Sequence, residues 1–269
     1  MGGGMTLRLV LVGWGAIGTE VARLLSARAA PVTLAGVAVR DASTLRAGLA
    51  DVPLIHDPSE LAALTPDLVV EAAGRAAVLP WGRAALEAGA DFAPASTSAF
   101  ADDAVLAELV ELARTAGRQV LIPPGALGGI DALAAAARLS LASVMHEVTK
   151  PPAAWRGTRA ETLCDLDRLA EAHAFFTGPA RLAATEYPQN ANVALISALA
   201  GLGPDQTEIR LVADPAARLN RHRVIATGDF GRMEITLDNR PFAANPKSSA
   251  LTALSLVRLI ENRVAPLVM

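Results

Sequence analysis

The sequence is poor in the residues from which several classes of site are built. It holds one cysteine, Cys164, in 269 residues, so no internal disulfide and no cysteine-based metal cluster can form. Lysine and arginine together number 24 against 27 acidic residues and form no cluster, which argues against a nucleic-acid partner. No apolar run reaches the roughly 20 residues of a membrane-spanning helix. We therefore expect a cytoplasmic protein with no membrane or nucleic-acid partner, and assign it no metal site.

Lysine is also scarce, because almost all of the positive charge is arginine. Lys150 and Lys247 are the only two lysines, and either is a candidate base or a ligand for a substrate carboxylate. What the chain has in abundance is apolar residues, 52% of the total, with a net charge of −3. This composition is typical of a globular protein with a large core, and the length suits one large domain or two ordinary ones.

The first half of the chain alternates apolar strands with amphipathic helices. Leaving out MGGG, the apolar run that follows is short and ends in glycines, so it predicts a strand rather than a signal peptide. The alternation predicts an α/β domain over residues 1–128, a Rossmann-type doubly wound parallel sheet. The predicted strands are 7–12, 32–39, 67–74 and 119–125. One predicted helix begins at residue 16, and two others span 80–92 and 102–117.

The second half has a different pattern, which predicts an α+β domain over 129–244 with a largely antiparallel sheet. Its predicted helices are 129–139, 166–176 and 191–201, and its predicted strands are 143–150, 207–214, 220–227 and 232–239. A last helix over 245–262, capped by Asn245 or Ser248, has Ala253, Leu256, Val257 and Ile260 at helical spacing. We expect the C-terminal segment 245–269 to pack back on the first domain.

Three glycines between the first strand and the first helix predict a dinucleotide site. Gly13 permits the tight turn, Gly15 lets the backbone approach a pyrophosphate, and Gly18 lets helix and strand pack closely. Ala16 and Ile17 complete the turn and are counted among the cofactor-binding residues. The positive end of the helix then faces the phosphates. Trp14, a large side chain between the first two glycines, has neither glycine role.

The end of the second strand carries the residues expected to select the cofactor. Asp41 suits the ribose hydroxyls of NAD, whereas Arg40 suits the 2′-phosphate of NADP. The pair leaves both cofactors open. Glu71, late in another strand, is placed towards the cofactor crevice but is assigned no role, and the lone thiol Cys164 is interpreted as structural.

Four histidines are candidates for an acid or base, because an imidazole titrates near neutral pH. His56 lies in a polar loop, His173 in a predicted helix, and His146 in mid-strand, where it could line a cleft. His222 begins a strand with small, apolar neighbours on its own face, while Arg221 and Arg223 point the other way. The pattern therefore favours His222 for a functional role, with a satisfied core histidine as the alternative.

Five sequence blocks, in this order, resemble the L-aspartate dehydrogenase family, and the similarity runs from Leu7 to Val257. The blocks are LIPPGALGGIDAL (121–133), KPPAAWRGT (150–158), YPQNANVALISALAGLG (187–203), RLVADPAARLNRHRV (210–224) and NPKSSALTALSLVR (245–258). The resemblance implies an oxidoreductase that converts L-aspartate to iminoaspartate or oxaloacetate and ammonia with NAD or NADP, or runs the reverse amination. It also implies a homodimer, and for some members a place in pyridine nucleotide biosynthesis.

The resemblance further implies roles for individual residues. His222 matches the catalytic acid/base of the family, and Ala126 and Asn192 match positions that contact the cofactor. From the residues alone, Asn192 suits either a helix cap or the nicotinamide carboxamide, and Asn190 is a second candidate cap. Trp14 and the stretch Ser98-Ala99-Phe100 depart from the family pattern, the latter in a loop expected near the nicotinamide.

Two other interpretations remain open on the sequence. One is another oxidoreductase of the same architecture, similar to homoserine dehydrogenase or dihydrodipicolinate reductase. The other is a non-catalytic NAD(P)-binding sensor, which predicts cofactor binding without turnover of any amino acid. Turnover measured with several amino acids separates them.

Overall fold

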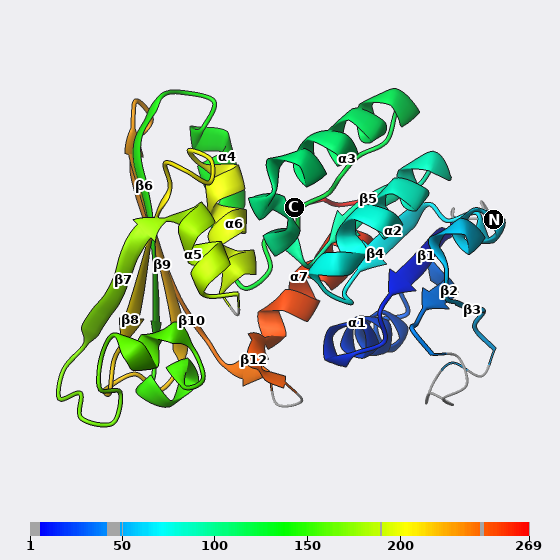
Figure 1. Ribbon diagram of the computed structural model, residues 1–269. Helices are drawn as coiled ribbons and strands as arrows, with labels where there is room; N and C mark the ends of the chain where they lie inside the picture. The colour runs from blue at the N-terminus through cyan, green and yellow to red at the C-terminus, as the bar shows by residue number, and fades with distance from the viewer. Residues whose placement is uncertain (1–5, 42–48, 50, 189, 243–244, 269) are drawn as a thin grey trace. The chain divides into compact units, whose positions relative to one another are not determined.

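The computed structural model describes residues 6–41, 49, 51–188, 190–242 and 245–268 (Figure 1). The chain forms two compact units, one of Met1–Pro123 with Thr252–Met269 and the other of Pro124–Leu251. It therefore leaves the first unit at Pro123, builds the second, and returns at Thr252 to complete the first. Within the described ranges, no helix combines the length and the apolar character needed to cross a membrane.

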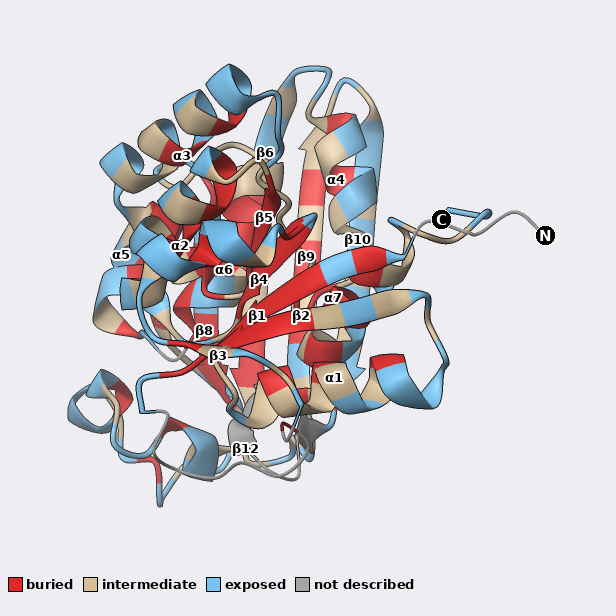
Figure 2. Ribbon diagram, turned by 90° about the vertical axis from the view of Figure 1, so that its right-hand side faces the viewer, coloured by how far each residue is buried: buried red, intermediate tan, exposed pale blue. Residues whose placement is uncertain are grey.

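The first unit contains a parallel sheet, as the sequence predicts, but two of its five strands, β3 and β5, were not predicted. Its strands are β1 (Leu7–Val12), β2 (Val32–Ala38), β3 (Leu54–Ile55), β4 (Leu68–Glu71) and β5 (Asp91–Pro94), in the order β3-β2-β1-β4-β5. The chain runs outward from β1 to β3 and then crosses to β4 on the other side of β1. Such a reversal of strand order marks the point where ligands bind, beyond the carboxyl ends of the strands. Figure 2 shows that β1 and β4 are buried along most of their length.

Helices complete the core of the first unit. They are α1 (Ala16–Ala27), α2 (Arg75–Glu87), α3 (Asp103–Ala116) and α7 (Ala250–Glu261), with 3-10 turns η1 (Pro58–Leu64) and η2 (Thr97–Ala101). Helices α2 and α3 pack side by side (Figure 1). The apolar stripe predicted for the last helix is buried in one core cluster with residues of β1 and α1, namely Ala253, Leu256, Val257 and Ile260.

Two helix boundaries in this unit differ from the prediction. The last helix begins at Ala250, because residues 245–249 form strand β12 (Asn245–Ser249), which pairs with β11 (Pro241–Phe242). Ser249 Oγ accepts a hydrogen bond from the Leu251 amide at 3.2 Å, so Ser249 caps the helix. The predicted caps Asn245 and Ser248 belong to strand β12, and their side chains are not among those described. The side chain of Lys247 lies outside the described part of the chain.

Helix α2 begins at Arg75, five residues before the predicted start, and Pro80 lies inside it. It ends at Glu87, five residues before the predicted end, because Asp91 and Phe92 pair with β4 as part of strand β5. The structure forms no extended strand over 119–125; Val120 makes an isolated parallel bridge with Phe92.

The second unit contains a five-stranded mixed sheet in the order β10-β9-β6-β8-β7. Its strands are β6 (Leu141–Lys150), β7 (His173–Pro179), β8 (Glu208–Ala213), β9 (Asn220–Gly228) and β10 (Gly231–Asn239). All neighbouring pairs are antiparallel except β6 with β8. Helices gather on one side of this sheet (Figure 1), namely α4 (Ile130–Ala136), α5 (Ala180–Glu186) and α6 (Ala191–Ala200), while η3 (Pro152–Trp155) and η4 (Arg159–Thr162) are short turns.

The predicted helix over 166–176 is wrong. His173 instead opens strand β7, which pairs with β8, and the side chain of His173 is exposed. The alanine and phenylalanine run suits either state, and pairing with a neighbouring strand decides between them.

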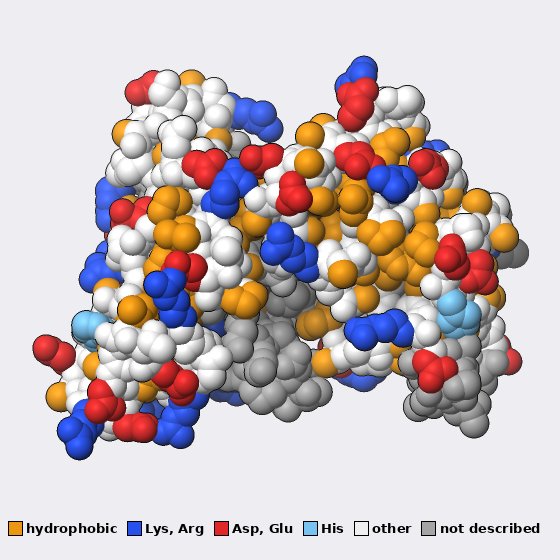
Figure 3. All heavy atoms as spheres, viewed as in Figure 1, with side chains coloured by type: hydrophobic (Ala, Val, Ile, Leu, Met, Phe, Trp, Pro, Cys, Tyr) orange, Lys and Arg blue, Asp and Glu red, His pale blue; other side chains and the backbone are white. Residues whose placement is uncertain are grey.

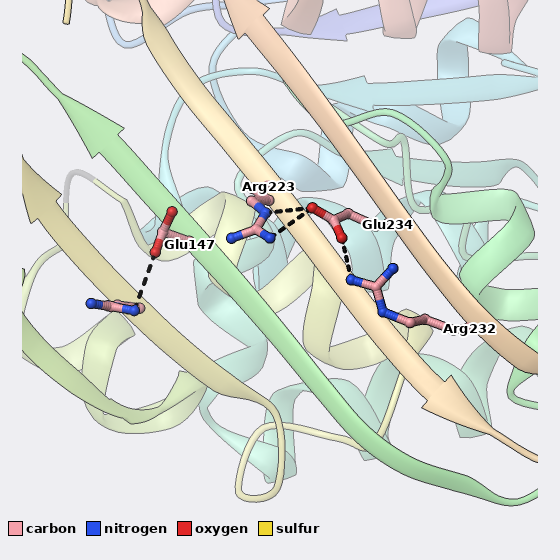
Figure 4. Close-up of polar contacts among 5 residues, drawn as sticks. Glu147, Arg223, Arg232 and Glu234 are labelled. Atoms are coloured by element: carbon pink, nitrogen blue, oxygen red, sulfur yellow. Dashed lines mark hydrogen bonds and ion pairs between the residues drawn. The ribbon is translucent and has the colours of Figure 1, made fainter.

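The face of this sheet that the helices leave open carries ion pairs, most of them between neighbouring strands. Glu234 accepts from both Arg223, at 2.7 Å, and Arg232, while Glu147 pairs with Arg210 at 3.6 Å (Figure 4). Arg221 pairs with Asp238 on the same face. Pairs this exposed contribute little stability each, but they show that Arg221 and Arg223 point away from His222, as strand alternation predicts. Charges of both signs are interspersed on the surface drawn in Figure 3.

Candidate functional site

The glycine turn of the first unit has the geometry of a phosphate-binding loop. Gly13 has φ of +101°, and a Cβ there would lie 2.9 Å from the backbone of Ala72. A Cβ on Gly18 would lie 2.2 Å from the carbonyl oxygen of Gly13. A Cβ on Gly15, the N-cap of α1, would meet nothing within 4 Å. Two glycines thus allow close packing, and the third keeps the first amides of α1 open to an anion.

A cavity of about 640 Å³ opens beside this turn. The N-termini of α1 and α2 both contribute to it, so two helix dipoles direct positive ends into one space. The lining residues are Val12–Gly15, Ala38–Arg40, His56, Ala72–Ala77 and Trp81. Ala16 and Ile17 are the first two residues of α1; the Ile17 side chain packs against the core, which leaves its backbone as the group available to a cofactor.

Trp14 does not block the turn. Its side chain is half-buried, packs against the core cluster of the first unit, and lines one side of the cavity. The tryptophan is therefore a wall of the cavity, and the backbone of the turn remains accessible at Gly15.

Glu71 holds in place the turn Ala72–Gly74, which lines the cavity before α2. Its fully buried carboxylate accepts from the amides of Ala73 and Gly74, both at 2.7 Å, and from the amide and hydroxyl of Ser96, both at 3.1 Å. Burial raises the pKa of Glu71, and these hydrogen bonds oppose the rise. Glu71 therefore has a positioning role, which was not predicted from the sequence. The only sequence signal for it is an acidic residue at the end of a strand, directly before an Ala-Ala-Gly turn.

Arg40 and His56 lie together at the end of the cavity formed by β2 and β3. Arg40 is exposed, lines the cavity, and has no ion-pair partner within the described ranges. Asp41, the alternative ribose ligand, follows it and is exposed. His56 also lines the cavity, and its Nδ1 lies 2.8 Å from the carbonyl oxygen of Val39. The sequence placed His56 in an ordinary loop and missed this position.

His222 lies in the second unit, on the helix-covered face of the sheet. It is 5% exposed, and the register places it opposite Val148, between His146 and Lys150 of the adjacent strand. Its Nδ1 lies 3.1 Å from Nε2 of His146, and the ring centroids are 5.3 Å apart. Burial first, then the charges of His146 and Lys150, lower the pKa of His222 well below its ordinary value. His222 is therefore a neutral imidazole at pH 7.

Lys150 places a cation beside this imidazole. Its Nζ donates to Oδ1 of Asn190 at 2.6 Å and lies 5.1 Å from the ring centroid of Trp155. Burial lowers the pKa of Lys150 to about 8, so the amine is still mostly protonated at pH 7. Asn190 is the N-cap of α6 by position, yet its side chain makes no capping bond because Lys150 uses its oxygen.

The remaining predicted site residues occupy separate places. Ala126 is buried, and its carbonyl oxygen accepts from Nδ2 of Asn239 at 2.7 Å. Asn192 is the second residue of α6 and is exposed. The departure at residues 98–100 lies in η2, where Phe100 is buried. Burial, then Asp165, raises the pKa of the Cys164 thiol, which makes it a poor nucleophile.

Comparisons with known proteins match both halves of the chain. Residues 13–123 match the family model described as "Homoserine dehydrogenase, NAD binding domain", and residues 131–263 match "Aspartate dehydrogenase, C-terminal". An aspartate dehydrogenase structure from Thermotoga maritima superposes with a TM-score of 0.78 at 24% identity, covering 98% of this chain and 100% of that one, and so shows the same fold.

Curated relatives are similar over nearly their whole length. The L-aspartate dehydrogenase of Brucella anthropi is 60% identical over 258 residues, which is 96% of each chain. That of Pseudomonas aeruginosa is 44% identical over 261 residues, covering 95% of this chain and 97% of the relative. This level of identity over nearly the full length shows that the chain belongs to the L-aspartate dehydrogenase family.

Proposed function

We propose that this protein oxidises L-aspartate with NAD or NADP, giving iminoaspartate and then oxaloacetate and ammonia, and catalyses the reverse amination. The observation that carries the proposal is the pair in the second unit formed by the buried imidazole of His222 and the half-buried amine of Lys150, which the strand register places on one face. An amino-acid substrate with two carboxylates needs both a base and a cation, and this pair supplies them.

The first unit fits a nicotinamide dinucleotide. The open backbone at Gly15 and the N-terminus of α2 suit the pyrophosphate, and Arg40 or Asp41 suits the adenosine ribose. We further propose cofactor contacts at Ala126 and Asn192, as the family resemblance implies. The cofactor, when bound, accepts the hydride that leaves Cα of the substrate.

His222 is proposed as the acid/base. A neutral imidazole accepts a proton, so it can take the proton released by the substrate ammonium or by the water that attacks the imine carbon. It returns that proton when the amine leaves as ammonia. Burial keeps bulk water from competing for the ring and holds the imidazole neutral over the working pH range.

The direct test follows the absorbance of reduced nicotinamide with purified protein. L-aspartate is expected to give the highest kcat/KM among L-aspartate, D-aspartate, L-glutamate and L-homoserine, with both NAD and NADP tried. Cofactor binding without turnover of any of these would support the sensor interpretation and overturn the proposal. Faster turnover of homoserine would assign a different substrate class. Sedimentation of the same sample tests the proposed homodimer.

Arg40 is expected to contribute to NADP binding much more than to NAD binding. Removing a charge-assisted contact to a 2′-phosphate costs roughly 1.5–3 kcal/mol, so Arg40→Ala should raise the KM for NADP about 10–100-fold. The KM for NAD should change less than about threefold. Arg83→Ala is the control, since Arg83 pairs with Glu108 on the exposed surfaces of α2 and α3. An equal change for both cofactors would remove Arg40 from the phosphate site.

Lys150 is expected to bind a substrate carboxylate as a cation, which gives KM a pH dependence. Its pKa of about 8 means that the amine loses its proton as pH rises through 8. The KM for L-aspartate should therefore rise about fivefold from pH 8 to pH 9. Lys150→Arg, which stays protonated, should flatten this rise, and Lys150→Met should raise KM at every pH. The same rise in Lys150→Arg and in the unchanged protein would refute the assignment.

A further inference from the structure

The buried face of the second sheet holds a chain of three polar side chains that ends at His222. Ser197 Oγ lies 3.0 Å from Nδ1 of His146, and Nε2 of His146 lies 3.1 Å from Nδ1 of His222. His146 and Ser197 are both fully buried. Ser197, His146 and His222 come from α6, β6 and β9, so this hydrogen-bonded row forms only when the unit is folded.

The direction of hydrogen bonding in this chain is set at Ser197. Its hydroxyl lies 3.0 Å from the carbonyl oxygen of Ala194 and 3.2 Å from that of Val193. Carbonyl oxygens only accept, so a hydroxyl proton given to either of them leaves the serine oxygen as an acceptor, and the following steps take this arrangement. Nδ1 of His146 then carries the proton that it donates to Ser197.

The position of the proton on His146 then determines the position of the proton on His222. A neutral histidine has one N–H, so His146 with its proton on Nδ1 presents a lone pair at Nε2. That lone pair accepts from Nδ1 of His222, which leaves Nε2 of His222 unprotonated. Burial lowers the pKa of His146 to about 4, which keeps this ring neutral and able to accept.

We propose that His146, itself oriented by Ser197, is a positioning residue that keeps the proton of His222 on Nδ1 and its lone pair on Nε2. This proposal rests on the proposed role of His222 as the base. The lone pair of the base is then held on one fixed nitrogen before substrate binds. Where the partner that orients a catalytic histidine is altered so that the wrong tautomer is favoured, turnover falls by up to about 10⁴-fold.

The other neighbours of His222 leave His146 as the group that selects the tautomer. Lys150, on the far side of Val148, is an ammonium that donates and cannot accept a proton from Nδ1. Leu237 of β10 lies opposite His222 and is apolar. Arg221 and Arg223 lie on the other face in their own ion pairs.

Long-range ¹H–¹⁵N correlation spectra of the ¹⁵N-histidine-labelled full chain test this proposal without relying on activity. Such spectra distinguish protonated from unprotonated ring nitrogens, and four histidines make assignment by single variants practical. We expect His222 and His146 both to carry the proton on Nδ1. Exposed His173 serves as an internal reference. A proton on Nε2 of His222 would overturn the proposal.

Three variants extend the test to turnover. His146→Leu removes the acceptor, and we expect a mixed His222 tautomer and a kcat lower by about 10–100-fold, with cofactor KM within about twofold. His146→Gln offers an amide oxygen to Nδ1 and should restore most of the turnover. Ser197→Ala, a loss of one oxygen atom, keeps the test available should His146→Leu not fold, and should lower kcat about tenfold with a mixed tautomer of His146.

The outcomes separate this proposal from the proposed function. An unchanged His222 tautomer and an unchanged kcat in both His146→Leu and Ser197→Ala would overturn the positioning role alone. A tautomer that depends on His146, in a protein whose turnover does not depend on His222, would instead overturn the role of His222 as the base.

Discussion

His222→Gln is expected to lower kcat with L-aspartate by about 10²–10⁴-fold, the usual contribution of a positioned acid or base. The amide side chain keeps a hydrogen-bond donor for Nε2 of His146 but has no basic nitrogen, so the protein should stay folded and bind cofactor normally. The measurements are steady-state turnover, cofactor affinity by fluorescence titration, and the melting temperature.

His173→Gln is the matched control, because it makes the same chemical change at an exposed histidine of the same unit. Its turnover should equal that of the unchanged protein. If His222→Gln kept more than about half of the original kcat while binding cofactor, another group would have to serve as the base.

Alanine at two positions of the glycine turn is expected to separate stability from cofactor binding. The Cβ of Gly18→Ala would lie 2.2 Å from the Gly13 carbonyl oxygen, so the turn must shift, at a cost of about 1–3 kcal/mol for overpacking. Because this turn is the proposed pyrophosphate site, cofactor affinity should fall as well. Thermal unfolding and the KM for NAD and NADP measure the two effects.

Gly15→Ala is the partner variant. Its Cβ meets nothing within 4 Å and its φ of −86° suits any residue, so the melting temperature should stay within about 1–2 °C. The added methyl group stands in the space proposed for the phosphates, so cofactor KM should rise about tenfold or more. Equal cofactor affinity in Gly15→Ala and the unchanged protein would move the pyrophosphate site elsewhere.

Much of the first unit could be predicted from sequence, because its signals are local. Its strands are buried on both faces and appear as apolar runs, and the last helix shows its buried stripe at helical spacing. Strand β3 escaped prediction because it has only two residues, and β5 because Asp91 and Phe92 were assigned to the end of a helix. The segment from 166 to 176 was predicted wrongly because its state is decided by pairing with β8, which is distant in sequence.

The site residues likewise divide into those with a local sequence signal and those placed by contacts distant in sequence. The glycine turn is a local pattern, and the face of His222 follows from strand alternation around it. Lys150 was singled out because lysine is scarce, but its proximity to His222 required the register of β6 with β9. The contacts of His146 with Ser197 span 51 residues, and those of Glu71 with Ser96 span 25. A single sequence contains no signal of such distances.

The return of the chain at Thr252 has a consequence for synthesis on the ribosome. A nascent chain that has emerged as far as Pro123 contains all five strands of the first sheet, but it lacks the helix whose side chains at Ala253, Leu256 and Ile260 close the core. The segment 124–251, made later, contains its whole sheet and is complete before the last helix of the first unit has been synthesised. We therefore expect the cofactor-binding unit to complete its core after the second unit, the reverse of vectorial folding from the N-terminus.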